Sequence, residues 1–136
     1  MKKILYFIII AISVVCCKKN EIATFDGTSW EAPAAENGAK YLLSFTDYST
    51  ATLQVTGEKD GDASVSSGTY IANENAVIFS RLKMYHEFHH EYGANIDAFI
   101  VDDAILAPDG KLTVNVHFDP EHYTSTLSYS IIFTKR

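Results

Sequence analysis

The chain has 136 residues, of which 47% are hydrophobic, and a formal net charge of −6. This length and apolar content suit one domain with one hydrophobic core. The acidic balance excludes nucleic acid as an expected partner, because phosphates repel such a surface and the sequence has no run of lysines and arginines to offset the repulsion.

The N-terminus has the pattern of a bacterial export signal. Two lysines precede an apolar run, residues 4–15, that is too short for a spanning helix of about 20 residues. The run ends in Val15-Cys16-Cys17, which matches the lipoprotein pattern of aliphatic and small residues before a lipidated cysteine. We predict Cys17 as the lipidated residue, because lipidation of Cys16 would place the bulky Val15 in the position of a small residue.

These features divide the chain into three parts: a lipoprotein signal peptide at residues 1–16, a lipidated tether at 17–26 and a folded domain at 27–136. Two or three acyl chains anchor a protein stably. We therefore expect a protein of the cell envelope, held by its lipid at the outer membrane. Because both cysteines lie in the signal region, a disulfide framework in the domain is excluded.

The domain consists of strand patterns separated by turn sequences. Residues 112–118 and 127–134 follow an alternation of apolar and polar side chains with period two, which is typical of half-buried strands. Weaker runs of the same kind lie at 29–31, 41–46, 52–56, 65–72, 76–80 and 96–106. About eight sequential antiparallel strands predict an all-β up-and-down barrel, with an interior wide enough for side chains or one small ligand.

Four longer connections alternate with tight turns along the chain: 32–40, 57–64, 81–95 and 119–125. In an up-and-down barrel such connections gather at one rim, and binding residues are often carried by loops on a rigid scaffold. The aromatic candidates for a ligand-binding rim are Tyr85, Phe88, Tyr92 and Tyr123.

The connection 81–95 fits two conformations. Helical spacing relates Leu82, Tyr85, His89 and Tyr92 and predicts one short amphipathic helix. The alternation of Met84, Phe88 and Tyr92 predicts a strand extension instead. The sequence leaves both open.

This connection also carries the zinc-protease pattern His-Glu-x-x-His. On a helix, His86 and His90 would bind one zinc ion, and Glu87 would act as general base on its water. The longer form of the pattern has a third ligand at the position of Ile96, whose side chain cannot bind metal. A zinc hydrolase is therefore the weakest of the functions considered.

Two further interpretations apply to the histidines. A metal ion at the rim would use His86, His89 or His90, with His122 or Asp119 completing the site, and zinc is the one cofactor to consider. Alternatively, these histidines are surface side chains without a ligand. His117 alternates to the polar face of its strand and is predicted on the outside of the barrel.

Short motifs in the domain resemble a known family. Gly27-Thr28-Ser29-Trp30 resembles the Gly-x-Trp entry of lipocalin-like barrels, with one additional residue. Three other segments resemble small lipocalin-like (calycin) lipoproteins of the Bacteroidota: Gly68-Thr69-Tyr70, Val77-Ile78-Phe79 and Ile132-Phe133-Thr134-Lys135. The resemblance implies a lipocalin-like barrel in which Trp30 closes the narrow end.

We therefore expect a non-catalytic, lipid-anchored binding barrel that takes a small molecule, a glycan or a metal ion at its rim. The alternative is a protein-interaction module, either a protease inhibitor or a subunit of an envelope complex. An apolar cavity in the barrel would favour the first function. A packed interior with an exposed apolar rim would favour the second.

Overall fold

The computed structural model describes residues 24–33, 38–57, 63–90, 93–125 and 127–136, and for 86–90 and 93–97 it describes the backbone alone. These residues form nine strands and no helix: β1 (Ser29–Ala32), β2 (Lys40–Phe45), β3 (Thr50–Thr56), β4 (Ala63–Asn73), β5 (Ala76–Ser80), β6 (Lys83–His90), β7 (Gly93–Leu106), β8 (Leu112–Phe118) and β9 (Ser128–Lys135). Within these ranges, no helix is long and apolar enough to cross a membrane.

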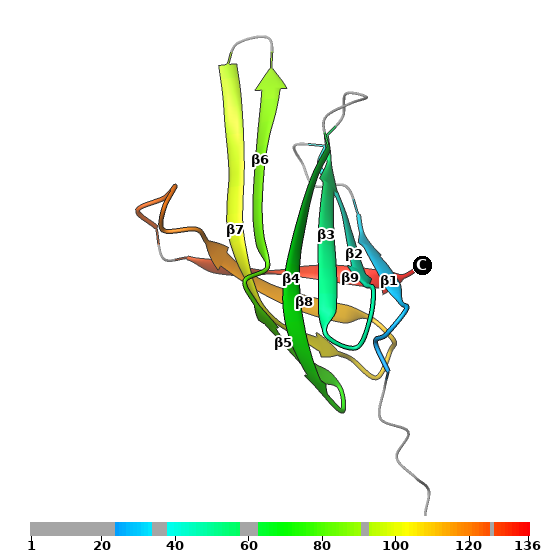
Figure 1. The fold of residues 1–136 in the computed structure, drawn as a ribbon. Helices are drawn as coiled ribbons and strands as arrows, with labels where there is room; N and C mark the ends of the chain where they lie inside the picture. The colour runs from blue at the N-terminus through cyan, green and yellow to red at the C-terminus, as the bar shows by residue number, and fades with distance from the viewer. Residues whose placement is uncertain (1–23, 34–37, 58–62, 91–92, 126) are drawn as a thin grey trace, which may run out of the picture.

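Eight of the strands close an antiparallel barrel (Figure 1). Neighbours in the chain pair from β1 to β5 and from β7 to β9. Two short seams join these groups: β1 pairs with β9 at Trp30 and Glu31, and β5 pairs with β7 through Ala76, Val77 and Ile78. The predicted all-β up-and-down barrel is confirmed, with β6 as an additional strand.

The segment predicted as a helix or a strand extension forms β6 and the first part of β7. The pairing runs from Lys83, opposite Ile100, to His90, opposite Gly93. The helix prediction is therefore wrong and the strand alternative is correct. A short isolated helix is marginal, whereas the long β7 offers β6 a continuous hydrogen-bonding edge. Arg81 has a φ of 64°, outside the range of an extended strand, and it separates β5 from β6.

Side chains fill the interior of the barrel. Phe45, Phe99 and Phe133 are among the largest of the fully buried residues. Trp30 is also buried, and its indole N–H donates a hydrogen bond to the Thr28 hydroxyl at 2.9 Å. The aromatic rings pack against one another; for example, the Phe45 and Tyr70 ring centroids are 4.8 Å apart in an edge-on arrangement. The described part of the barrel is thus a packed core.

The strand order places the four predicted connections at one end of the barrel. The β1–β2, β3–β4, β6–β7 and β8–β9 connections share this end, which we call the rim, because successive strands run in opposite directions. The β2–β3, β4–β5 and β7–β8 turns lie at the other end. Figure 1 shows the β6–β7 hairpin extending toward the rim beside β3 and β4.

Candidate functional site

The described residues include only part of the predicted site. Cys17 and Tyr92 lie outside them. Phe88 and three histidines (His86, His89 and His90) lie on β6, where the description is limited to the backbone. Tyr85, His122 and Tyr123 are described with their side chains. Whether the histidines of β6 bind a metal stays a prediction.

The backbone of β6 nevertheless bears on the zinc-protease pattern. His86 lies opposite Asp97, and His90 lies opposite Gly93, in a regular antiparallel ladder. A strand rises about 3.3 Å per residue, so the Cα atoms of the two histidines are about 13 Å apart instead of one helical turn. The helical arrangement that this pattern requires is absent from this segment.

An opening lies between β4 and β6. β4 pairs with β5 only from Thr69 to Asn73, and in the described part of the sheet no second strand forms a ladder with residues 63–68 of β4 on the side away from β3. The two strands meet at Gly68, where an added Cβ would lie 2.7 Å from the backbone nitrogen of Leu82. From this contact they diverge toward the rim (Figure 1). We call this opening, between residues 63–68 and 83–85, the split.

A cleft of about 350 Å³ occupies the split. Its lining contains three consecutive residues from each strand, Ser64 to Ser66 and Lys83 to Tyr85, together with Asp119, Glu121 and His122 from the β8–β9 connection. Side chains alternate between the two faces of a strand. A cleft lined by consecutive residues therefore faces the backbone edges of β4 and β6.

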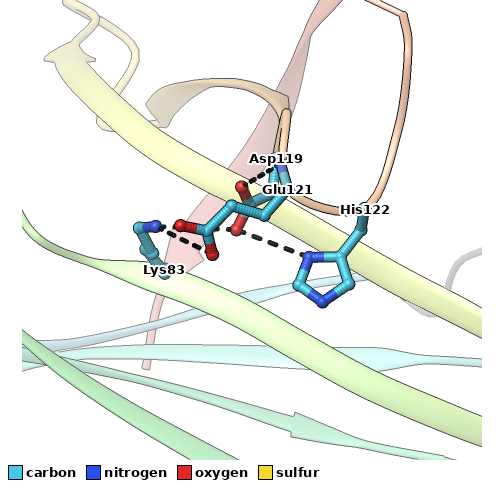
Figure 2. A network of polar contacts seen from close by, with 4 residues as sticks. All are labelled: Lys83, Asp119, Glu121 and His122. Carbon is cyan, nitrogen blue, oxygen red and sulfur yellow. Dashed lines mark hydrogen bonds and ion pairs between the residues drawn. The ribbon is translucent and has the colours of Figure 1, made fainter.

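A polar cluster flanks the cleft (Figure 2). The Lys83 ammonium lies 3.8 Å from Asp119 Oδ2 and 3.7 Å from Glu121 Oε2, and His122 Nδ1 lies 3.7 Å from the same Asp119 oxygen. The Asp119 side chain is only 4% exposed, whereas that of Glu121 is 71% exposed. Two carboxylates thus share one lysine.

The backbone explains why these residues converge. The Asp119 N–H donates to the Ala98 carbonyl of β7 at 3.1 Å, and the N–H groups of His122 and Tyr123 both donate to the Asp119 carbonyl at 3.0 Å. The Asp119 carboxylate accepts a further hydrogen bond from the Glu121 N–H at 3.0 Å. This local turn, typical of aspartate, presents Glu121 and His122 beside Lys83.

The aromatic candidates separate into two groups. The Tyr85 ring lies 4.9 Å from the His122 ring, at the polar cluster. Tyr123 lies 4.9 Å from Phe118, which in turn contacts Tyr129. His117 lies on the outer face as predicted, with its Nδ1 2.7 Å from Asp102 Oδ2.

The sequence reasoning did not single out Lys83 or Glu121. Glu121 had a local signal, since it follows Asp119 by two residues at the end of a predicted strand. Lys83 had no local sequence signal, because its partners come from another part of the chain.

The polar cluster has donor atoms suited to a divalent cation. Three possible ligand atoms lie within 4.8 Å of one another, one each from Asp119, Glu121 and His122. Two carboxylate oxygens and an imidazole nitrogen are donors that zinc accepts. The Lys83 ammonium already lies against both carboxylates, so a metal ion would have to displace it.

The architecture is compatible with a lipocalin-like fold, since eight antiparallel strands close the barrel. Comparisons of the chain with protein-family models, with curated proteins and with solved structures give no match.

Proposed function

We propose that this chain is a lipocalin-like lipoprotein of the cell envelope, of the kind found in the Bacteroidota, anchored through lipid on Cys17. Its barrel, residues 27–136, acts as a non-catalytic module that binds a protein partner on its outer surface. The export pattern of residues 4–17 supports the anchoring. The filled interior supports binding on the surface.

The packed core is the observation that carries this proposal. A carrier of small apolar molecules needs a cavity, and pockets for such ligands measure about 300–1,000 Å³ and bury most of the ligand. Here Phe99 and Phe133 fill the centre together with Met84, each no more than 1% exposed. The clefts among the described residues are open to the surface of the barrel. This arrangement favours a protein partner over an enclosed small molecule.

The outer surface carries the apolar side chains that such a partner needs. Among the residues whose side chains the structure describes, nine large hydrophobic ones are exposed: Tyr48, Val65, Ile71, Ile78, Tyr85, Ile105, Leu127, Tyr129 and Ile132. Ile71 and Ile78 lie directly opposite each other on β4 and β5. Apolar patches of this kind often mark interaction surfaces.

A fluorescent fatty acid, cis-parinaric acid, tests whether the interior takes a ligand. The full chain in detergent micelles should give the same fluorescence titration as micelles alone. Saturable one-to-one binding that is removed by Ala51→Phe, a substitution at a fully buried position, would contradict the proposal. Ala76→Phe, at an exposed position on β5, is the control.

The anchoring is tested by labelling with radioactive palmitate in a bacterium that exports lipoproteins. The unaltered chain and Cys16→Ser should carry the label, and Cys17→Ser should not. Label retained by Cys17→Ser and lost by Cys16→Ser would move the lipid to Cys16. No label in any of the three would remove the lipid anchor from the proposal.

A second candidate function, divalent metal binding, is favoured by the convergence of Asp119, Glu121 and His122 within 4.8 Å. The full chain is dialysed against trace zinc, and retained metal is measured by elemental mass spectrometry. Near-stoichiometric zinc that is lost in His122→Ala and kept in His117→Ala would support this candidate. Absence of retained zinc would exclude a stable site at this cluster.

A further inference from the structure

The unpaired edge of β4 has backbone groups available for hydrogen bonding. The Tyr70 N–H donates to the Ser49 carbonyl on the β3 side at 2.8 Å. In an antiparallel strand the backbone groups of alternate residues point to opposite sides. The N–H and C=O groups of Ser67 and Val65 therefore point away from β3 and into the split, where no described strand pairs with them.

The facing edge of β6 has the same property. The Leu82 carbonyl accepts a hydrogen bond from the Val101 N–H at 2.9 Å, which places the backbone groups of Leu82 on the β7 side. By the same alternation, Met84 also points toward β7, and the N–H and C=O groups of Lys83 and Tyr85 point toward β4. Two unpaired edges thus face each other across one cleft.

We propose that the split accepts an extended segment of the protein partner as an inserted β-strand. This inference rests on the proposed function and names the class of partner. Unpaired strand edges are templates for added strands, and strand addition is a common mode of peptide recognition. Because β4 and β6 run in opposite directions, the inserted strand is antiparallel to one of them and parallel to the other.

The shape of the split limits the inserted segment. The stretch of β4 without a second described strand beside it, residues 63–68, spans about 20 Å at the usual rise per residue. The contact of Gly68 with Leu82 closes the inner end. The segment therefore enters from the rim and stops at Gly68, which fits a chain end or the tip of an exposed loop.

The charges beside the split favour an inserted segment with a positive charge. Asp119 and Glu121 share the single ammonium of Lys83, which leaves a net negative charge next to the cleft. The whole chain is also acidic, with a formal net charge of −6. An inserted strand with a lysine or arginine on its outward face is therefore favoured over an acidic one.

Ser67→Pro is the decisive variant. It removes the N–H that points into the split and leaves the β3–β4 ladder intact, because proline at an edge position costs no existing ladder bond. Ser67→Ala keeps the N–H and removes only the exposed hydroxyl, so it is the matched control. Circular dichroism establishes that both variants fold.

The probe is a random hexapeptide library displayed on phage, selected against the full chain in detergent micelles. We expect enrichment of alternating sequences with a basic residue. The best synthetic peptide should bind the unaltered chain and Ser67→Ala equally, and bind Ser67→Pro about tenfold more weakly, as expected for one lost backbone hydrogen bond. Hydrogen exchange should show protection of the amides of Val65, Ser67, Lys83 and Tyr85 by the peptide.

Three outcomes would overturn the inference. These are no enrichment above empty micelles, equal binding by Ser67→Pro, or a peptide that protects other strands. Sedimentation that shows a dimer of the unaltered chain and a monomer of Ser67→Pro would identify the occupant as a second copy instead. The parinaric acid titration is independent of all these results, so it separates a failure of strand insertion from a failure of the proposed function.

Discussion

The hydroxyl of Tyr70 donates a hydrogen bond to the main-chain carbonyl of Asp47 at 2.7 Å. Tyr70 is buried on β4, and Asp47 lies in the exposed turn between β2 and β3. The pKa of Tyr70 is raised mainly by burial of its hydroxyl group, and the nearby negative charge of Asp26 is the next largest cause. The bond ties the turn to the strand that borders the split.

Tyr70→Phe should destabilise the barrel by about 1 kcal/mol, the typical net worth of one hydrogen bond. The cost arises because the Asp47 carbonyl loses its donor while the ring still packs against Phe45. Thermal unfolding measures it, with an expected fall in Tm of about 4 °C. Tyr48→Phe is the control, since the Tyr48 side chain is 82% exposed. Equal effects of the two variants would show that the Tyr70 hydroxyl adds nothing.

Asp47 should make stability depend on pH in the acid range. Hydrogen bonds from the Ser49 N–H, at 2.8 Å, and the Thr50 N–H, at 2.7 Å, lower the pKa of its carboxyl group. A lowered pKa stabilises the fold above the unfolded value of about 3.9, and this contribution is lost as the pH falls through the folded value.

Asp47→Asn should remove that dependence. Chemical unfolding at a series of pH values should show the variant less stable than the unaltered chain near neutral pH, with a difference that shrinks below about pH 4. Asp109→Asn, in the exposed turn before β8, is the matched control. A difference that stayed constant across the series would contradict the role of the ionised carboxylate.

Lys83→Met should destabilise the protein by about 1 kcal/mol, because it leaves the buried carboxylate of Asp119 without its ammonium. The value is modest since the Lys83 side chain is 47% exposed and the pair is partly screened by water. Lys111→Met is the control, because its partner Asp109 is itself 58% exposed. A second measurement combines Lys83→Met with Asp119→Asn, and strictly additive effects would disprove the coupling.

Gly68→Ala should cost about 1–3 kcal/mol, the usual range for overpacking. The added Cβ would lie 2.7 Å from the Leu82 nitrogen and 2.8 Å from its Cα, and neither backbone atom can rotate away. Denaturant unfolding measures the loss, with Ser67→Ala as a control on the same strand. A variant as stable as the control would mean that β4 and β6 separate at this point without cost.

The strands were largely predictable because their patterns are local. The strongly alternating residues 112–118 match β8 to the residue, and the weaker run 76–80 matches β5 to the residue. β6 was predicted only as one of two alternatives, because its sequence also fits helical spacing, and pairing with β7 decides for the strand. The Lys83–Asp119 contact could not be predicted from the sequence either, because only the tertiary fold brings β6 next to the β8–β9 connection.

The short seams have a consequence for how the chain folds. Each group of strands, β1 to β5 and β6 to β9, is built from hairpins between chain neighbours, whose contacts close small loops and form fast. The β1–β9 seam instead joins the two ends of the domain through two ladder pairs, Trp30 with Lys135 and Glu31 with Thr134, and the Arg136 N–H extends it with a hydrogen bond to the Ser29 carbonyl. We therefore expect the two groups to form first and this seam to form last. A chain cut back before Thr134 should keep its hairpins and fail to close the ring.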